Sequence, residues 1–293
     1  MPDVGEFAPA KVNLTLHVLG RRPDGYHEIE SLVAFADIGD RLTFVPGDTP
    51  ELAVRGPNAK AAGPNRDNLV LKATRLLGER VKGLEVGSFT LDKELPVAAG
   101  LGGGSSDAAA ALRLLAKHNG LLLDDPRLHE AARLTGADVP VCLDPRPRMM
   151  RGTGEILGAP LTFLALPAVL VNPGASVPTR DVFAKLSLRG SAAPHPRLAT
   201  DRGRVGAVDL FNTIEAARND LEPPAIALQP VIADVLAALR ESAACALSRM
   251  SGSGATCFGL FDSRRAAKAA AKTLSAKYPR WWVRATELGP FSP

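Results

Sequence analysis

The chain has 293 residues, of which 46% are hydrophobic and 23% charged, and its formal net charge is +4. This composition is typical of a globular protein with a sizeable core, and the three cysteines, without any Cys-x-x-Cys, argue against a disulfide framework or a zinc site. No apolar run reaches the length of a membrane span and the first seven residues carry no signal-peptide pattern, so we expect a cytoplasmic protein.

The first third of the chain is predicted to be mainly β-structure. Residues 11–18 alternate, with Val12 and Leu14 on an apolar face and Asn13 and Thr15 on a polar face, which is typical of a strand. The Pro-Asp-Gly sequence at 23–25 predicts a turn. Further strands are predicted at 29–35, 41–45, 51–55 and 85–91, and a helix at 68–81.

A glycine-rich loop follows at residues 96–107, which read Pro-Val-Ala-Ala-Gly-Leu-Gly-Gly-Gly-Ser-Ser-Asp and run into an Ala/Leu-rich helical segment. Glycines let successive backbone N–H groups approach one anion, and a helix N-terminus adds about half a positive charge. The loop matches neither Gly-x-x-x-x-Gly-Lys-Ser/Thr nor the dinucleotide fingerprint, because Ser105 stands three residues after Gly102. It predicts a cradle for a polyphosphate; the plain alternative is a flexible turn capped by Ser105 or Ser106.

The rest of the chain mixes helices and adjacent strands, which predicts an α+β fold. The Pro-, Arg- and Gly-rich segment 144–158 is interpreted as a connection between two domains, residues 1–155 and 156–293. Helices are predicted at 107–117, 126–134, around Asp138, at 226–239 and at 263–277; strands at 162–171, 246–250, 256–261 and 281–286; and a surface loop at 189–206.

Three segments, in this order, resemble the three motifs of the GHMP (galactokinase, homoserine, mevalonate and phosphomevalonate) kinase superfamily: residues 9–14, 100–107 and 250–258. Three more resemble those members that act on a cytidine-diphosphate sugar-alcohol: residues 22–27, 136–140 and 219–222. The resemblance covers residues 7 to about 261. It implies a two-domain fold, with an N-terminal domain like ribosomal protein S5 domain 2, a C-terminal α/β domain, and an active site in the cleft between them.

The resemblance implies transfer of the γ-phosphoryl group of ATP to a hydroxyl of that sugar-alcohol, a step in non-mevalonate isoprenoid synthesis. Lys11 matches the family's active-site lysine, whose charge steadies the γ-phosphate, and Asp138 matches its catalytic aspartate. Whether Asp138 orients the acceptor hydroxyl or takes its proton stays open. On the residues alone, Lys11 reads as a solvated strand lysine and Asp138 as a cap or turn residue.

The resemblance also implies two binding sets. The ATP set is Pro96, Val97, Ala98, Ala99, Gly100, Leu101, Gly102, Gly103, Gly104, Ser105 and Ser106, with Asn68 and Lys93 nearer the nucleoside. The acceptor set is Asn13, Tyr26, His27, Thr179, Phe183, Gly252 and Ser253. A helix cap at Asn68, a solvated Lys93 and a core Phe183 are the alternatives. Mg²⁺ is expected with ATP, without an identified protein ligand.

Two other functions are weighed against this one. A kinase of the homoserine or mevalonate type is disfavoured by the Tyr26-His27 pair and by residues 219–222. An S5-like RNA-binding protein draws support from the isoelectric point near 9.1, but the basic residues are dispersed and no aromatic platform is evident. We therefore expect small-molecule substrates, no nucleic-acid or membrane partner, and an oligomeric state that the sequence leaves open. Residues 141–150 depart from the family pattern.

Overall fold

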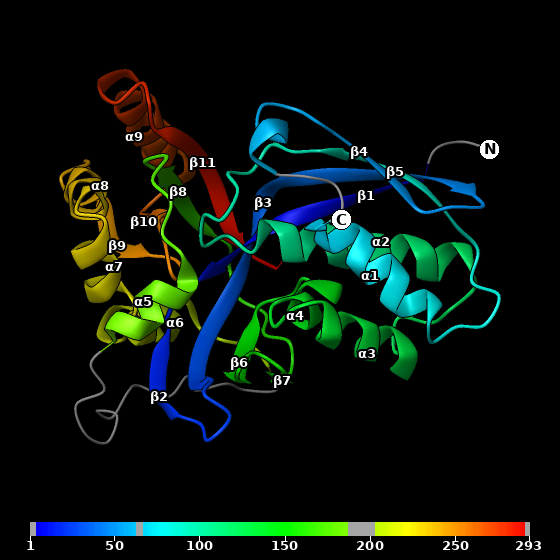
Figure 1. Cartoon of the computed structure of the whole chain (residues 1–293). Coiled ribbons are helices and arrows are strands. Elements are labelled where there is room, and N and C mark those ends of the chain that lie inside the picture. Colours follow the sequence, from blue (N-terminus) through cyan, green and yellow to red (C-terminus); the bar gives the residue numbers. More distant parts are fainter. Residues whose placement is uncertain (1–3, 63–66, 187–202, 291–293) are drawn as a thin grey trace.

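The computed structural model describes residues 4–62, 67–186 and 203–290. Within these residues the strands join one mixed sheet with helices packed against it, so the predicted α+β class is confirmed (Figure 1). The strands are β1 (Val4–Asn13), β2 (His17–Arg21), β3 (His27–Gly47), β4 (Glu51–Arg55), β5 (Val86–Asp92), β6 (Arg148–Gly152), β7 (Ile156–Leu157), β8 (Leu166–Asn172), β9 (Cys245–Met250), β10 (Cys257–Phe261) and β11 (Trp282–Gly289).

The long strand β3 organises the sheet. It has 21 residues and pairs antiparallel with β1, β2, β5, β6 and β11. The sheet runs in the order β4-β5-β3-β11-β8-β10-β9, and β11 therefore links the strands of the first half of the chain to those of the second. The apolar side chains that β3 contributes, such as Leu32, Phe35 and Phe44, are almost fully buried. Burial of this kind is the main source of the sheet's stability.

The helices lie in two groups, one beside each half of the sheet (Figure 1). The long helix α2 packs on β1 and contacts α1, α3 and α4, whereas α8 and α9 pack on the strands of the second half. Among the described residues, none of these helices has the length and apolar character needed to cross a bilayer. The helices are α1 (Leu69–Gly78), α2 (Gly103–His118), α3 (Pro126–Thr135), α4 (Val139–Leu143), α5 (Thr179–Lys185), α6 (Ala207–Ala216), α7 (Glu222–Leu228), α8 (Val231–Arg240) and α9 (Arg264–Lys277).

Helix caps and small side chains explain two of these helices. Ser263 accepts a hydrogen bond from the Ala266 amide and caps α9, as its position before the helix predicts. Helix α2 is buried from Ser106 to Ala116, and its alanines let the helix backbone approach β1 closely. The N-terminus of α2, and with it the glycine-rich loop, is thereby placed next to the end of β1.

Several element predictions need correction. Segment 144–158 is not a bare connection, because β6 pairs with β3 from Ile29 opposite Gly152 to Val33 opposite Arg148. The helix predicted at 226–239 is two helices, α7 and α8, because Pro230 lacks the N–H that would continue the first one. The strand predicted at 11–18 is interrupted after Asn13, and the strand predicted from 162 begins at Leu166. Most of the loop predicted at 189–206 lies outside the described residues.

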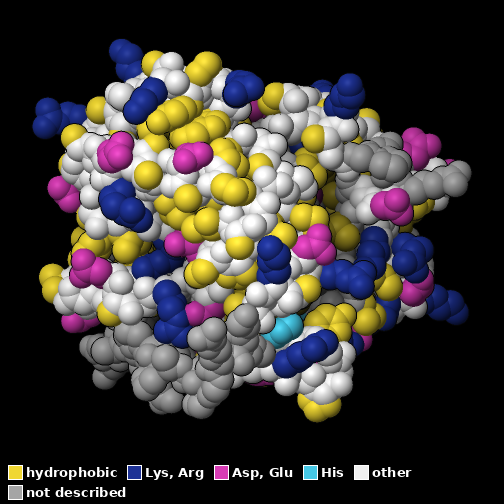
Figure 2. Space-filling view, turned by 60° about the vertical axis from the view of Figure 1, so that its left-hand side comes forward, with side chains coloured by type: hydrophobic (Ala, Val, Ile, Leu, Met, Phe, Trp, Pro, Cys, Tyr) yellow, Lys and Arg dark blue, Asp and Glu magenta, His cyan; other side chains and the backbone are white. Residues whose placement is uncertain are grey.

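The charged side chains are spread over the surface. On the face shown in Figure 2, Lys and Arg lie in small groups interrupted by Asp and Glu, with hydrophobic side chains between them. Many of the charges form exposed pairs, such as Arg133 with Glu130 at 2.7 Å and Arg127 with Asp125 at 2.7 Å. On this face the two signs of charge are therefore mixed.

Candidate active site

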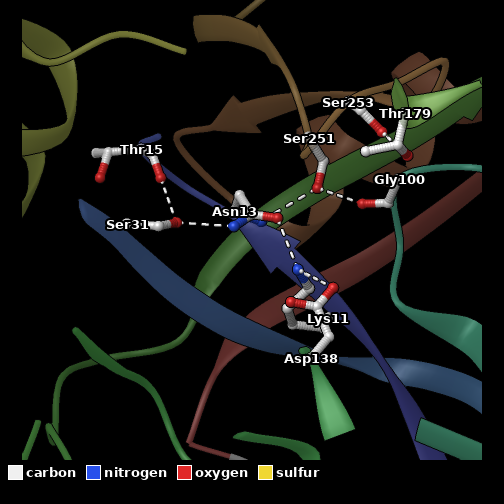
Figure 3. A network of polar contacts seen from close by, with 9 residues as sticks. All are labelled: Lys11, Asn13, Thr15, Ser31, Gly100, Asp138, Thr179, Ser251 and Ser253. Atoms are coloured by element: carbon white, nitrogen blue, oxygen red, sulfur yellow. Dashed lines mark hydrogen bonds and ion pairs between the residues drawn. The ribbon is translucent and has the colours of Figure 1, made fainter. Parts of the chain in front are cut away.

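The side chains of Lys11 and Asp138 form an ion pair although they are 127 residues apart in the chain. Lys11 lies near the end of β1, and Asp138 directly precedes α4. The Lys11 Nζ atom is 2.9 Å from Asp138 Oδ2 (Figure 3). Lys11 is buried, whereas the Asp138 side chain is 33% exposed. The pair therefore presents a carboxylate to solvent and a fixed cation behind it.

Asn13 lies beside this pair, and its amide orientation follows from its neighbours. The Ser31 hydroxyl donates to the Thr15 carbonyl oxygen at 2.5 Å, so it can only accept from Asn13 Nδ2, at 2.7 Å. The other end of the amide, Oδ1, then faces Lys11 and accepts from its ammonium group at 2.9 Å (Figure 3). Two of the three Lys11 protons are thus assigned, one to Asn13 and one to Asp138.

The glycine-rich loop passes directly over the ion pair. Gly102 has a φ of +60°, and a Cβ placed on it would lie 3.1 Å from Lys11 Cε and 3.9 Å from Asp138 Oδ2. Gly100 has a φ of +76°, and a Cβ there would come within 2.3 Å of the Ser251 carbonyl oxygen. A Cβ at Gly100 would clash with the backbone, and at Gly102 the left-handed φ and the close lysine side chain favour glycine. The loop residues predicted to bind phosphate and the predicted catalytic pair are therefore in contact.

The remaining loop residues lie at its two ends, and those from Gly103 onward belong to α2. Val97 and Ala98 are exposed at the outer part of the loop, and Ala98 adopts a φ of +51° that a glycine would reach with less strain. Ser106 lies in the first turns of α2; its hydroxyl is buried and has no hydrogen-bond partner among the described residues. An unpaired buried hydroxyl is costly unless a ligand satisfies it.

The turn between β9 and β10, residues 251–256, closes the other side of the loop. The Ser251 hydroxyl donates to the Gly100 carbonyl oxygen at 2.9 Å and accepts from the Asn13 amide at 3.1 Å (Figure 3). A Cβ on Gly252 would lie 3.3 Å from Asn13 Oδ1. Ser253 and Thr179 contact each other through their hydroxyls at 2.8 Å. The turn is thus both a hairpin connection and one wall of the site.

His27 and Phe183 form a stacked pair, with ring centroids 4.7 Å apart and ring planes at 25°. His27 begins β3 and Phe183 lies on α5, which also carries Thr179. Burial and, to a smaller degree, the Arg21 charge lower the pKa of His27, so the ring is neutral near pH 7. Tyr26 precedes it and is 65% exposed. These four predicted acceptor residues thus come from the start of β3, the turn before it and α5, with the aromatic pair joining β3 to α5.

Lys93 is not a solvated lysine. Its ammonium lies 2.6 Å from Asp40 and 2.6 Å from Asp107, and all three side chains are buried. Burial raises the pKa of Asp107, while for Lys93 the two carboxylates outweigh burial and raise its pKa. Asp40 also accepts from the amides of Glu94 and Leu95 at 2.7 and 2.8 Å. The cluster therefore anchors the chain just before the glycine-rich loop.

Replacing Lys93 by methionine is expected to lower the free energy of unfolding by about 3–5 kcal/mol, because it leaves buried carboxylates without their cation. The change is measured by urea unfolding of the variant against the wild type. Lys268→Met on the exposed side of α9 is the control, with an expected change within about 0.5 kcal/mol. A Lys93→Met protein as stable as the wild type would contradict this reading of the cluster.

Asn68 caps α1, since its side chain accepts from the Val70 amide at 2.9 Å. The structure thus gives Asn68 and Lys93 structural contacts of their own and does not bring either side chain to the Lys11–Asp138 pair. Both were predicted to lie nearer the nucleoside, and this remains a prediction.

Residues 219–222 lie against the turn at 251–256 and hydrogen-bond to its backbone and to that of Met250 before it. Asn219 Nδ2 donates to the carbonyl oxygens of Met250 and Gly252, both at 2.8 Å, and Glu222 accepts from the Met250 amide at 2.8 Å. Asp220 accepts from the Val18 amide at 2.8 Å and so holds β2. This segment therefore shapes the turn at 251–256 rather than contacting the catalytic pair.

Sequence reasoning missed the supporting residues Ser31, Ser251 and Arg249. Arg249 donates to the carbonyl oxygens of Leu14, Ile214 and Ala217, and burial lowers its pKa to about 10. Each is a polar residue that a buried strand or turn holds for contacts distant in sequence. A polar residue inside an otherwise apolar run, as at Ser31, is the one signal that points to such a role.

Two family models match this chain. The family model "GHMP kinases N terminal domain" matches residues 68–144, and "GHMP kinases C terminal" matches residues 203–280. The chain is 57% identical to a 4-diphosphocytidyl-2-C-methyl-D-erythritol kinase of Rhodopseudomonas palustris, with 96% of each protein covered. It is 59% identical to the protein of that name from Methylobacterium radiotolerans, over 98% of this chain and 100% of the relative.

Solved structures of kinases also resemble this chain. The chain resembles a crystal structure of 4-(cytidine 5'-diphospho)-2C-methyl-D-erythritol kinase with a TM-score of 0.79 and 35% identity, over 98% of this chain and 100% of that one. A homoserine kinase from Cytophaga hutchinsonii aligns with a TM-score of 0.70 at 19% identity, over 99% of this chain and 96% of that one, which shows a shared fold only.

Proposed function

The chain belongs to the GHMP kinase family, and from this membership we propose that it transfers the γ-phosphoryl group of ATP to the 2-hydroxyl of 4-diphosphocytidyl-2-C-methyl-D-erythritol. Its identity to kinases of that name, 57% and 59% over nearly the full length, supports this substrate. The observation that carries the proposal is the Lys11–Asp138 ion pair, 2.9 Å long, directly beneath Gly102. A cation and a carboxylate there can hold an alcohol against a bound terminal phosphate.

In the proposed mechanism the third Lys11 proton faces the γ-phosphate, since Asn13 and Asp138 take the other two. Phosphoryl transfer passes through a loose transition state with charge on the equatorial oxygens, so a fixed ammonium next to them lowers the barrier. Asp138 orients the acceptor hydroxyl and accepts its proton as the hydroxyl oxygen bonds to the γ-phosphorus, while the bond from that phosphorus to the β,γ-bridging oxygen breaks and ADP leaves. Asn13 holds the sugar-alcohol through its amide.

ATP is proposed to lie with its phosphates on the amides of residues 96–106, and the cytosine against His27, Phe183 and Tyr26. The stacked ring pair and the neutral imidazole support the second assignment, because a flat aromatic surface and ring nitrogens suit a pyrimidine. Thr179, Gly252 and Ser253 complete the acceptor side. We also retain the division into residues 1–155 and 156–293; the site draws Lys11, the loop and Asp138 from the first, and Thr179 and the 251–256 turn from the second.

Mg²⁺ is proposed to enter with ATP. No three His, Cys, Asp or Glu side chains in the described part of the chain gather into a metal-holding group. Mg²⁺ commonly binds nucleotides mainly through the phosphates and water. The unpartnered Ser106 hydroxyl is the protein oxygen that would hold it. When bound, the ion neutralises charge on the phosphates.

The test is an acceptor comparison with the purified protein, ATP and Mg²⁺. We expect rapid ADP release with 4-diphosphocytidyl-2-C-methyl-D-erythritol, none above background with homoserine, mevalonate or phosphomevalonate, and loss of turnover when EDTA removes the metal. ADP is followed by a coupled assay, and the product by phosphorus NMR. Rapid ADP release with homoserine or mevalonate, and none with the cytidine compound, would overturn the proposal.

A further inference from the structure

Three successive carbonyl groups of the glycine-rich loop are each held by a different hydrogen bond. The Ala99 oxygen accepts from the Thr256 amide at 3.1 Å, and the Leu101 oxygen accepts from the Lys11 amide at 2.8 Å. Between them, the Gly100 oxygen accepts from the Ser251 hydroxyl at 2.9 Å. The donors come from β1 and from the turn between β9 and β10, so residues 99–101 of the loop are held at every carbonyl.

This fastening fixes where the loop's N–H groups point. A trans peptide is planar, with its C=O and N–H directed oppositely. In each of these three peptides the N–H, which belongs to Gly100, Leu101 or Gly102, therefore points away from the donor that holds the carbonyl. These three N–H groups donate no hydrogen bond within the described residues. They are the donors that an anion above the loop would meet.

Ser251 is the only side chain among the three fastening donors, since the other two are backbone amides. It is fully buried, and its hydroxyl has a second contact: it accepts from the Asn13 amide at 3.1 Å. One hydroxyl thus joins the middle carbonyl of the loop to the strand that carries Lys11 and Asn13 (Figure 3). The Ser251 hydroxyl oxygen therefore fixes the position of the glycine-rich loop relative to the end of β1.

We propose that Ser251 is a positioning residue, whose hydroxyl turns the Leu101 N–H toward the nucleotide's phosphates. This inference rests on the proposed binding of ATP by the loop. Without the hydroxyl, the Gly100 carbonyl loses its partner, and the peptide between Gly100 and Leu101 is free to rotate because glycine permits many conformations. The phosphates then lose a pre-oriented donor, while contacts to the nucleoside remain.

The experiment compares Ser251→Ala with Ser248→Ala, a matched control in β9 whose buried hydroxyl has no hydrogen-bond partner among the described residues. Dissociation constants for ATP and for adenosine, which has no phosphate, are measured by calorimetry, with competition for the weaker ligand. We expect Ser251→Ala to weaken ATP binding about tenfold and adenosine binding by less than about twofold, as loss of a buried hydrogen bond implies. Ser248→Ala should match the wild type for both ligands.

A purely structural role for Ser251 would weaken ATP and adenosine by the same factor, and that result, or unchanged ATP affinity, would overturn the proposal. Ser251→Cys keeps a weak donor of similar size and is expected to fall between wild type and Ser251→Ala, which also covers the case where the alanine variant does not fold. Binding is measured without an acceptor, so this test does not depend on the identity of the acceptor. A wild type that binds ATP but turns over no cytidine substrate would refute the proposed reaction, and the Ser251 variants would still test the role proposed for Ser251.

Discussion

Replacement of Asp138 by alanine is expected to lower the turnover number by about 10²–10⁴-fold, the range typical of a general acid–base group. The dissociation constant for ATP should change little, because the loop amides and not Asp138 are proposed to hold the phosphates. Asp138→Asn should behave almost the same, since its amide keeps the shape but neither accepts the hydroxyl proton nor carries charge. Steady-state kinetics with both substrates and calorimetry with ATP give the two quantities.

Asp124→Asn is the matched control, because Asp124 is exposed in the connection between α2 and α3 and lies outside the proposed machinery. It should retain wild-type kinetics. If either Asp138 variant kept turnover within a few-fold of the wild type, the role assigned to this carboxylate would be wrong. A loss confined to Asp138→Ala, with Asp138→Asn fully active, would show that Asp138 orients the acceptor hydroxyl without accepting its proton.

Lys11→Met is expected to reduce the turnover number by about 10²–10³-fold, the usual cost of removing one donor that stabilises transition-state charge. Methionine is of similar length and apolar, so the buried site stays filled while the ammonium is lost. The fold should tolerate the change better than it tolerates Lys93→Met, because the partner carboxylate of Asp138 is 33% exposed and keeps access to water.

Lys11→Arg tests geometry rather than charge. The loop backbone at Gly102 lies so close to the Lys11 side chain that it leaves no room even for a Cβ without a shift, so the broad guanidinium has little space and we expect it to restore less than a tenth of the activity. Kinetics of both variants, with circular dichroism to confirm folding, provide the measurement. An arginine variant as active as the wild type would show that a positive charge alone is sufficient. The exact position of that charge would then not be required for activity.

The sequence predicted the presence of the site better than its surroundings. The alternation at residues 11–18 indicated a strand, and the glycines at 100–104 indicated an anion cradle, because both are local signals. The same alternation placed Asn13 and Thr15 on a polar face, yet both are buried. A pattern along one strand cannot show that a helix and a hairpin turn, more than 80 residues away, cover that face.

Lys93 shows the same limit for a single side chain. In the sequence it is a lysine after a strand, and its partners Asp40 and Asp107 lie 53 and 14 residues away. Ion-pair partners at such distances come from sheet register and helix packing, which no local pattern encodes. In segment 144–158 the sequence analysis missed the strand β6 for the opposite reason, since the prolines and glycines are strong local signals that β-pairing with β3 overrides.

The length of β3 has a consequence for how the two halves of the chain depend on each other. It borders β1, β2, β5 and β6 on the first half and β11 on the second, so one continuous backbone carries hydrogen bonds for both. A fragment ending at residue 155 would lose the pairing of β11 with residues 35–36 of β3 and the hairpin turn that holds the glycine-rich loop. A strand edge left without its partner can form hydrogen bonds with another chain. We therefore expect neither half to fold well when it is expressed alone. A substitution that destabilises one half should also lower the stability of the other.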